Sequence, residues 1–401
     1  MDRGFRNYLV VNAGYCGFTI TDGAIRMLVL LYFHQLGYSP LEIAMMFLFY
    51  ELFGVVTNLV GGWLGSRIGL NRTMHIGMAL QVVALSMLTV PDDWLSVAYV
   101  MAAQALSGIA KDLNKMSAKA GVKLFLPDGL EEKLFRWVAI MTGSKNALKG
   151  AGFFIGAALL AGFGFRGALL ILAGMLVVVL IWTWWMLPSE IGKTKTKVRF
   201  KEIFSKCPQV NWLSAARFFL FGARDIWFVV GLPVYLQSVL GWSYTQVGGF
   251  LALWIIGYGF IQGLAPKIIR ALSEKTPDGM TIALWAMLLM LIPLAIVWAM
   301  QQGWEMDLVL ITGLTLFGVV FAMNSSIHSY LIVSWSDREK VSMNVGFYYM
   351  ANAGGRLVGT VLSGWVYQQQ GLEGCLYWSA GFLLLAGLLS LKLHQVNRAI
   401  C

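Results

Sequence analysis

Long apolar runs separated by short polar breaks dominate the pattern of this chain of 401 residues. Each run is about 20 residues long, the length that an α-helix needs to cross the roughly 30 Å hydrocarbon layer of a membrane. The pattern predicts twelve membrane-spanning helices, and the first run is too long for the apolar part of a cleavable signal peptide. We place the helices near residues 8–33, 41–65, 73–90, 95–118, 135–162, 168–187, 211–239, 244–269, 280–300, 307–333, 342–368 and 375–393.

The second half of the chain repeats the first. The stretch from Leu36, LGYSPLEIAMMFLFYELFGVV, aligns without gaps to LGWSYTQVGGFLALWIIGYGF from Leu240 at an offset of 204 residues. Residues 131–174 align at an offset of 207, which places Lys149 on Arg356. Two six-helix halves repeated in parallel, with a binding site between them, are typical of the major facilitator architecture. We therefore expect an all-α membrane protein with an N-terminal half at 1–187, a cytoplasmic linker at 188–210 and a C-terminal half at 211–401.

Composition and loop charge support a membrane protein and orient it. Hydrophobic residues make up 58% of the chain and charged residues only 12%, about half the charged share of a soluble domain. Lys and Arg residues fall in alternate loops, whereas the opposite loops carry Arg166 alone. By the positive-inside rule both termini are cytoplasmic, and the net charge of +10 reflects topology rather than nucleic-acid binding. The Lys-rich central loop is interpreted as a linker, with contact to lipid headgroups as the alternative.

Charged side chains inside the predicted spans carry the functional signal. Each charge in the bilayer core costs at least about 2.5–3.5 kcal/mol, so such residues normally face a cavity or a partner. Eight cations against four carboxylates leave a formal excess of +4, which predicts an anionic visitor. All of them lie on spans 1, 2, 4, 5, 7 and 11, and none lies on spans 3, 6, 9 and 12, which are peripheral in major facilitators. The cations are Arg26, Lys111, Lys115, Lys145, Lys149, Arg217, Arg224 and Arg356, and the carboxylates are Asp22, Glu51, Asp112 and Asp225.

Four of these cations are the first candidates for binding the anion. Lys145 and Lys149 lie four residues apart on one helical face, with Asn146 beside them, and their mutual repulsion favours an anionic ligand. Arg356 comes from the other half, and a guanidinium suits bidentate binding of oxyanions. Arg224 lies at a similar depth.

Three further cations, Arg26, Lys111 and Arg217, are secondary candidates. Lys115 and Arg217 lie nearer the cytoplasmic end of their spans, so snorkelling towards the interface is an equal alternative for both.

The four carboxylates admit two interpretations. Glu51 and Asp112, followed by Asp22 and Asp225, are candidates for coupling transport to protons, and pairing with cations is the alternative. Asp22 and Arg26 have the i,i+4 spacing of a local ion pair, and Asp112 can reach Lys115 at i+3. Arg224 and Asp225 are adjacent, so we expect them to point apart. The polar residues of the tenth span are interpreted as packing by hydrogen bonds between helices, with donation of hydrogen bonds to a ligand as the alternative; they are Asn324, Ser325, Ser326 and His328.

Two sets of sequence stretches resemble known families. The loop GWLGSRIGLNR at 62–72 partly matches a major facilitator motif, although Ser66 replaces its acid and Asn71 one of its bases. More specific are TDGAIRMLVLL at 21–31, AQALSGIAKDLNKMSAKAGVKL at 103–124, LFRWVAIMTGSKNALKGAG at 134–152 and NWLSAARFFLFGARDIWFVVGLPVYL at 211–236. These stretches, which include the unusual charges, resemble the major facilitator permeases of bacterial arsenic-resistance operons over essentially the whole chain.

That resemblance implies a function. The family is associated with export of 1-arseno-3-phosphoglycerate, which glyceraldehyde-3-phosphate dehydrogenase forms when arsenate replaces phosphate. It implies a multi-pass protein of the bacterial inner membrane, a small anionic substrate, a functional link to that dehydrogenase and no cofactor or nucleic-acid partner. We expect a monomer in contact with membrane lipid.

The sequence leaves two alternative functions. A facilitator or exchanger for another organophosphate or carboxylate is the alternative, and a membrane enzyme is a remote one because no HExxH, P-loop or nucleophile elbow occurs. The scattered cysteines, Cys16, Cys207, Cys375 and Cys401, give no disulfide or metal signal.

Overall fold

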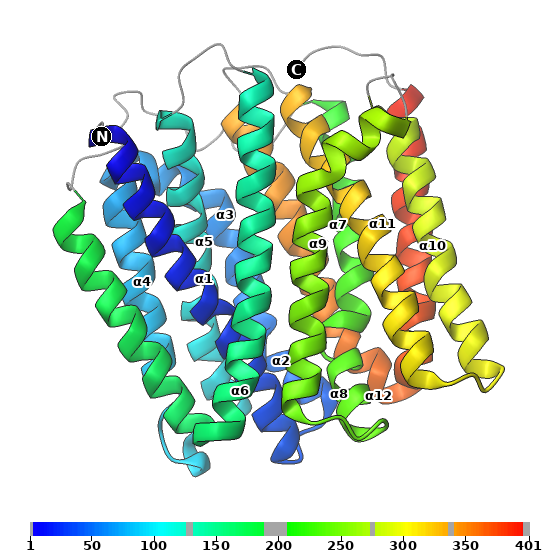
Figure 1. The fold of residues 1–401 in the computed structure, drawn as a ribbon, viewed down its shortest axis with the longest axis horizontal. Helices are drawn as coiled ribbons and strands as arrows, with labels where there is room; N and C mark the ends of the chain where they lie inside the picture. Colours follow the sequence, from blue (N-terminus) through cyan, green and yellow to red (C-terminus); the bar gives the residue numbers. More distant parts are fainter. Residues whose placement is uncertain (1–2, 126–130, 188–206, 273–276, 336–340, 396–401) are drawn as a thin grey trace.

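The computed structural model of the protein describes residues 3–125, 131–187, 207–272, 277–335 and 341–395. Within these ranges the chain is helical apart from short connections (Figure 1). Residues 188–206 of the predicted linker at 188–210 lie outside the described part of the chain. The side chains of residues 61–67, which include the first part of the loop motif at 62–72, also lie outside it. The next helix begins at Pro208, earlier than the start of the C-terminal half predicted at 211.

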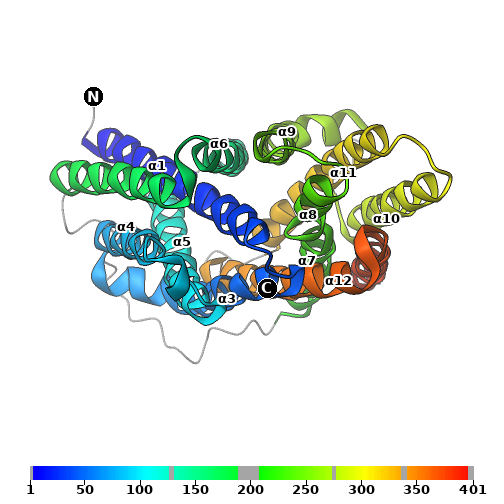
Figure 2. The same cartoon turned by 90° about the horizontal axis from the view of Figure 1, so that it is seen from below.

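The first half of the chain forms one group of helices and the second half forms another, side by side (Figures 1 and 2). The first group comprises α1 (Arg3–Gln35), α2 (Pro40–Met46), α3 (Leu48–Ile68), α4 (Leu70–Met87), η1 (Asp92–Trp94), α5 (Val97–Phe125) and α6 (Glu131–Met186). The second comprises α7 (Pro208–Phe228), α8 (Gly231–Ser238), α9 (Tyr244–Leu272), α10 (Gly279–Gln301), α11 (Met306–Ser334) and α12 (Val341–Gln395).

Each half ends in a long helix that reverses its direction at a glycine. The backbone of α6 is non-helical at Gly164, with φ 68° and ψ 179°, and that of α12 at Gly371, with φ 66° and ψ −162°. At these points the chain turns back along itself (Figure 1). The two glycines are separated by the same 207 residues as the sequence repeat, so α6 and α12 each supply two antiparallel crossings.

Replacement of Gly164 or Gly371 by Ala is expected to lower the free energy of unfolding by about 1–3 kcal/mol, because an L-residue is strained at these dihedral angles. Gly174→Ala and Gly381→Ala are matched controls, since both glycines are helical and a Cβ there meets nothing within 4 Å. Thermal unfolding in detergent measures the difference, and equal melting temperatures for all four variants would contradict this account of the reversals.

The described helices supply the crossings that the apolar runs predict. Eight helical segments are long and apolar enough to span a membrane, and two of them, Gly143–Met186 and Gly346–Leu393, contain a reversal and cross twice. The more polar α4 and α5 pack against each other among them. With these two helices the described part of the chain contains the expected twelve crossings.

The seventh crossing is broken, and its break is stabilised by a neighbouring helix. Residues Val229 and Val230 separate α7 from α8 and are buried. Ser363 on α12 accepts hydrogen bonds from the backbone N–H groups of Val230 and Gly231, both at 3.1 Å. Freed backbone groups need such partners inside a membrane, where water cannot satisfy them. The break begins at Val229, about one helical turn after Asp225, which belongs to the charged site described below.

The buried apolar residues show that the two halves meet closely at one face. One large cluster contains residues of both halves, among them Phe33 near the end of α1, Phe47 directly after α2 and Trp227 on α7. Two smaller clusters are confined to one half each, around Val10 and Met78 in the first and around Val210 in the second. The halves are therefore joined at the face where α1 passes into α2, and packed separately towards the start of α1 and the end of α12 (Figure 1).

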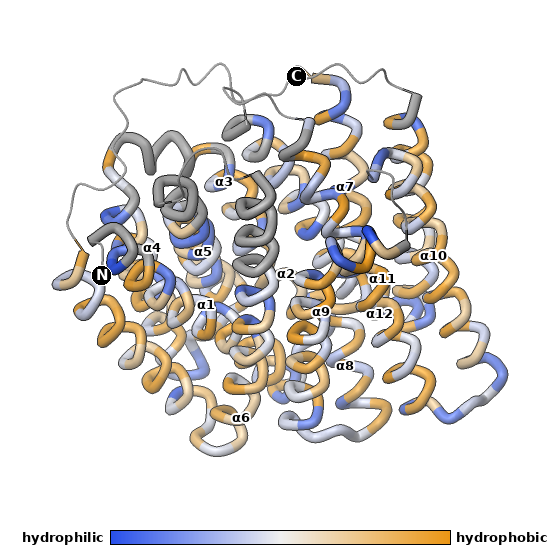
Figure 3. Tube along the Cα trace, turned by 45° about the horizontal axis from the view of Figure 1, so that its top comes forward, coloured by the Kyte–Doolittle hydropathy of each residue, from blue (hydrophilic) through white to orange (hydrophobic). Residues whose placement is uncertain are grey.

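Exposed apolar side chains mark the lipid-facing surface. They concentrate on the second part of α6, where Trp184 and Trp185 are 64% and 83% exposed, and on α10. Orange segments cover the outer helices in Figure 3, whereas blue segments occur within the interior and at the ends. An outer apolar surface around polar interior positions is the arrangement expected of a protein in lipid.

Candidate functional site

A cavity of about 160 Å³ lies between the two halves, and every intramembrane cation lines it. Its walls come from α1, α3, α5, the first part of α6, α7, α8, α9, α11 and the first part of α12. Among the described residues none of its lining belongs to α4, α10 or the second parts of α6 and α12. The structure therefore brings together all eight cations, together with Asp22, Asp112 and Asp225.

Glu51 lies behind the cavity wall and is the hub of an ion-pair network. Its side chain is fully buried, and its Oε1 accepts hydrogen bonds from Arg26 at 3.1 Å and from Arg356 at 2.6 Å. The ammonium of Lys111 lies 3.9 Å from Oε2 and sits over the ring of Tyr50. One carboxylate thus contacts three cations. Because Arg356 belongs to α12, this network also connects the two halves of the protein.

Asp22 pairs with a residue of another helix, and not with Arg26, which its i,i+4 spacing predicts. Its Oδ2 lies 3.5 Å from the ammonium of Lys149, and its Oδ1 accepts a 2.6 Å hydrogen bond from Tyr50. The expected local pair with Arg26 is wrong, because Arg26 turns to Glu51. The cause is the close approach of α1 and α6: a Cβ on Gly23 would lie 2.5 Å from the carbonyl oxygen of Lys149.

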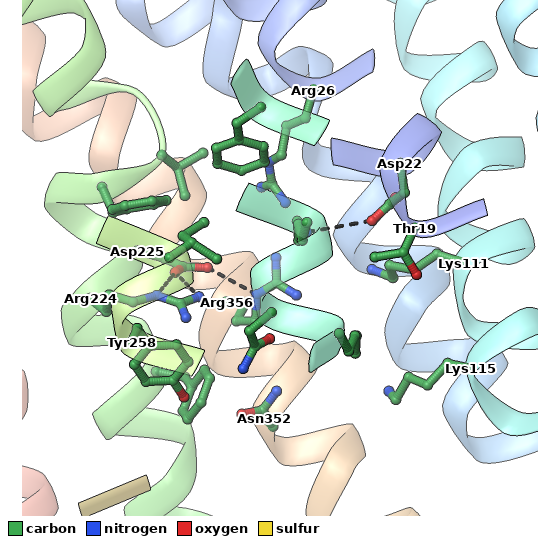
Figure 4. Close-up of a pocket in the computed structure, with 18 of the residues that line it drawn as sticks. Thr19, Asp22, Arg26, Lys111, Lys115, Arg224, Asp225, Tyr258, Asn352 and Arg356 are labelled. Atoms are coloured by element: carbon green, nitrogen blue, oxygen red, sulfur yellow. Dashed lines mark hydrogen bonds and ion pairs between the residues drawn. The ribbon is translucent and has the colours of Figure 1, made fainter. Parts of the chain in front are cut away.

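A second cluster, around Asp225, lies on the C-terminal half (Figure 4). Arg224 binds Oδ1 of Asp225 through Nε at 2.7 Å and also through Nη2, and Arg356 binds Oδ2 at 3.1 Å. The expectation that the adjacent Arg224 and Asp225 point apart is therefore wrong, because the long guanidinium folds back over its neighbour. Gly359 makes this cluster possible, since a Cβ there would lie 2.9 Å from that of Asp225.

On α5 the i+3 spacing predicts the contact of Lys115 with Asp112 correctly, whereas the contact of the adjacent Lys111 with Asp112 is not expected from spacing. Lys115 lies 3.1 Å from Oδ1 of Asp112 at the i+3 position and donates a 2.8 Å hydrogen bond to Asn58 of α3. Lys111 lies 3.8 Å from Oδ2 of the same carboxylate. Both lysines face the cavity. Snorkelling to the interface is excluded for Lys115, whose side chain is only 11% exposed.

Arg217 is buried among neutral partners. Its Nε donates to Asn352 at 3.0 Å, and its Nη1 donates to the carbonyl and hydroxyl oxygens of Ser325 at 3.1 and 3.0 Å. The guanidinium carbon lies 3.9 Å from the centre of the Phe221 ring. The residue is 4% exposed, so Arg217 does not snorkel either. Among the residues that the structure describes, it has no carboxylate partner.

Lys145 and Asn146 complete the predicted set at the cavity wall. Asn146 donates a 2.9 Å hydrogen bond to Gln262 of α9 and thereby joins the two halves. The polar cluster on α11 divides between its two interpretations. Ser326 bonds to the backbone of α9 at 3.2 Å, as a packing contact does, whereas Ser325 holds Arg217.

Several functional candidates escaped the sequence analysis. They are neutral hydrogen-bonding residues on the cavity wall, and an isolated Asn or Tyr in an apolar run gives no signal as clear as a charge. The structure adds Tyr15, Asn58, Tyr258, Gln262, Tyr349 and Asn352.

The charge balance of the cavity differs from the expectation in detail. Six cations lie within 4 Å of a carboxylate, because the four acids are shared. A shared carboxylate contacts more than one cation but carries only one negative charge. Eight cations and four carboxylates therefore still leave an excess of +4. A low-dielectric cavity with this excess attracts an anion.

Antiparallel crossings around a polar cavity between two halves are typical of secondary transporters. The family model of the Major Facilitator Superfamily matches residues 11–295, and the chain belongs to this superfamily. It is a transporter and not an enzyme. A comparison with curated proteins found no match.

Two solved structures share the fold. A POT family transporter, crystallised in complex with 5-aminolevulinic acid, has a TM-score of 0.73 at 13% sequence identity, with 96% of each chain covered. The human organic anion transporter MFSD10 (TETRAN) has a TM-score of 0.68 at 16% identity, covering 97% of this chain and 100% of its own. At these identities the similarity concerns the fold alone.

Proposed function

We propose that the protein exports an organic oxyanion from the cytoplasm across the bacterial inner membrane by alternating access. The observation that carries the proposal is the excess of +4 in one buried cavity lined by both halves. Lys145, Lys149, Arg224 and Arg356 are the principal binding residues, supported by Arg26, Lys111, Arg217 and Asn146. Desolvated cations bind phosphate-like groups strongly, and the guanidinium groups add bidentate geometry.

The separation of the two halves supports loading from the cytoplasm. The face at the α1–α2 connection is closed by the cluster that joins the halves. A Cβ on Gly364 of α12 would lie 2.5 Å from the carbonyl oxygen of Pro40, so little space remains there. The opposite face, which holds the start of α1 and the end of α12, is the cytoplasmic one under the positive-inside rule. This arrangement supports the proposal that substrate enters the cavity from inside the cell.

We further propose 1-arseno-3-phosphoglycerate as the substrate, with arsenate resistance as the consequence. The support is the resemblance of four charge-bearing stretches to permeases of arsenic-resistance operons. A three-carbon ester with phosphate at one end and arsenate at the other is a compact polyanion that suits a cavity with several cations. It is a hard oxyanion, for which cationic donors are better ligands than thiolates.

Lys149→Ala is expected to reduce uptake of the arsenate ester into everted membrane vesicles by at least about tenfold, because it removes a charge-assisted contact worth about 1.5–3 kcal/mol. Radiolabelled substrate generated with glyceraldehyde-3-phosphate dehydrogenase provides the measurement. Lys392→Ala, which changes an exposed lysine stacked on Trp212, is the matched control. Equal uptake by the wild type and the Lys149 variant would remove the proposed site.

Resistance of a sensitive bacterium separates this substrate from the alternatives. Expression of the protein should confer arsenate resistance only when the dehydrogenase is present, because that enzyme forms the ester. Protection without the enzyme would indicate free arsenate instead. Competition by sugar phosphates or carboxylates, or a requirement for an exchanged anion, would identify a facilitator or exchanger for another organic anion.

The four carboxylates are candidates for coupling export to protons. Glu51 and Asp112 come first, and Asp22 and Asp225 follow. All four contact cations of the cavity, so a substrate anion competes with them for the same partners. Their loss of charge would release cations for the substrate, which links their protonation state to binding.

A further inference from the structure

Arg217 differs from the cavity cations that are paired with an acid. It is 4% exposed, and its hydrogen-bond partners among the described residues are the neutral groups of Asn352 and Ser325. Those bonds use Nε and Nη1. Among the described residues no group accepts a hydrogen bond from Nη2, although Arg217 lines the cavity. A buried guanidinium without a counter-charge is costly, and neutral hydrogen bonds offset only part of that cost.

A second cation, Lys115 on α5 of the other half, contacts the same turn of α12 as Arg217 does. Arg217 lies 5.2 Å from the ring centre of Tyr348, and the ammonium of Lys115 lies 4.8 Å from that of Tyr349. Asn352, one turn further on, receives the hydrogen bond of Arg217. Residues 348–352 therefore separate two cations that approach the cavity from opposite halves. We call Arg217 and Lys115 the outer pair.

The outer pair lies at a different depth from the remaining cations. Arg217 and Arg224 are seven residues apart on the continuous helix α7, which corresponds to about 10 Å along its axis. In Figure 4, Lys115 and Asn352 lie on one side of the Arg224–Asp225–Arg356 cluster, and Arg26 lies on the other. The cavity thus offers cations at two levels, with the outer level nearer the start of α7.

We propose that the outer pair, with Arg217 as its main element, is a second anion subsite that selects substrates carrying an anionic group at each end. One end binds the inner cations around Arg356 and Lys149, and the other accepts hydrogen bonds from Nη2 of Arg217. This inference rests on the proposed function and deepens it, because it assigns separate cations of the cavity to the two anionic groups of the substrate. Arg217 is then a specificity-determining residue.

A structural role for Arg217 is the competing explanation. Stacking on Phe221 and the hydrogen bonds to Ser325 tie α7 to α11, and a purely structural residue would do the same. The two roles differ in one measurable respect. A structural role affects every ligand equally, whereas a second subsite affects only ligands with a second charge.

Binding of alkane-α,ω-diphosphonates with two to six methylene groups, compared with alkylphosphonates of matched length, tests the proposal. The full chain is purified into nanodiscs, and affinity is followed by titration calorimetry. In the wild type the best diphosphonate should bind about 10–100-fold more tightly than its monophosphonate, the gain expected of an added charge-assisted hydrogen bond. The gain should peak at one chain length, because two fixed subsites require one spacing.

Arg217→Gln should abolish this gain, so that the ratio of diphosphonate to monophosphonate affinity falls to about one. Lys149→Gln should weaken both ligands, and Arg217→Lys should restore part of the gain. Equal affinity of mono- and diphosphonates for the wild type at every length would overturn the second subsite while leaving the proposed function intact.

The remaining outcomes also discriminate. Loss of both ligands to the same extent in Arg217→Gln would assign Arg217 a structural role and overturn the proposal. Absence of binding by either ligand class to the wild type would overturn the proposed function itself. If Arg217→Gln does not fold, the chain-length series in the wild type decides, because a peak supports two subsites and a flat series contradicts them.

Discussion

Arg356→Gln is expected to lower transport by at least about a hundredfold, because removing one partner of a buried ion pair costs about 3–5 kcal/mol. Arg356 binds Glu51 of the N-terminal half at 2.6 Å and Asp225 of its own half at 3.1 Å. It is therefore both a candidate ligand of the substrate and the link between the two halves. Initial uptake rates in everted vesicles, normalised to the amount of protein in the membrane, give the effect.

Two variants separate charge from geometry in this experiment. Arg356→Lys keeps the positive charge and loses the fork that contacts two acids, so we expect an intermediate rate. Arg166→Gln breaks an ion pair with Asp92 in which the side chains are 49% and 51% exposed, and we expect almost no change. Comparable losses in the Arg356→Gln and Arg166→Gln variants would show that the buried network has no special role.

Glu51→Gln is expected to lower the melting temperature of the ligand-free protein and to increase its stabilisation by an oxyanion. The substitution keeps the shape of the side chain but leaves Arg26, Lys111 and Arg356 without their shared acid. Uncompensated buried charge of this kind costs about 3–5 kcal/mol. An anion that takes the place of the carboxylate recovers part of that free energy, because a ligand that binds only the folded state stabilises it.

Thermal unfolding with and without inorganic phosphate measures both effects. The shift produced by phosphate should be larger in Glu51→Gln than in the wild type. Asp93→Asn is the control, because Asp93 is an exposed acid in η1. An unchanged melting temperature and an unchanged phosphate shift in Glu51→Gln would show that Glu51 does not act as an internal substitute for the substrate.

For the charged residues, depth in the membrane and the shared cavity could be predicted from the sequence. Which charges lie in the membrane followed from the apolar runs, because a helix of fixed rise converts sequence position into depth. That they share one cavity followed from their absence on spans 3, 6, 9 and 12. The i+3 pair of Lys115 with Asp112 also followed, because neighbours on one helix face meet whatever the rest of the fold does.

The partners of Asp22 and Arg224 did not follow from the sequence. Asp22 has Arg26 at the favourable spacing and nevertheless pairs with Lys149, which lies 3.5 Å away on another helix. Arg224 folds back onto its neighbour, because Arg356 holds the other oxygen of Asp225. Spacing along one helix predicts which ion pairs can form within that helix. It does not predict whether those pairs are more stable than pairs with helices far away in the chain.

The sequence by itself determined the membrane class, the repeat between the two halves and the excess of cations within the apolar runs. These properties depend on the apolar runs, on the offset of the sequence repeat and on the sum of the charges. All of these can be read from the chain without knowing which helices are neighbours. Only the tertiary structure decided which acid holds which cation, that Glu51 joins the halves and that Arg217 is buried among neutral groups. Those outcomes depend on distances of a few ångströms between helices, which are set by contacts such as those of Gly23 and Gly359 with their neighbours. Coulomb energy in a poorly screened interior is steep over that range, so small differences in helix approach select the pairs.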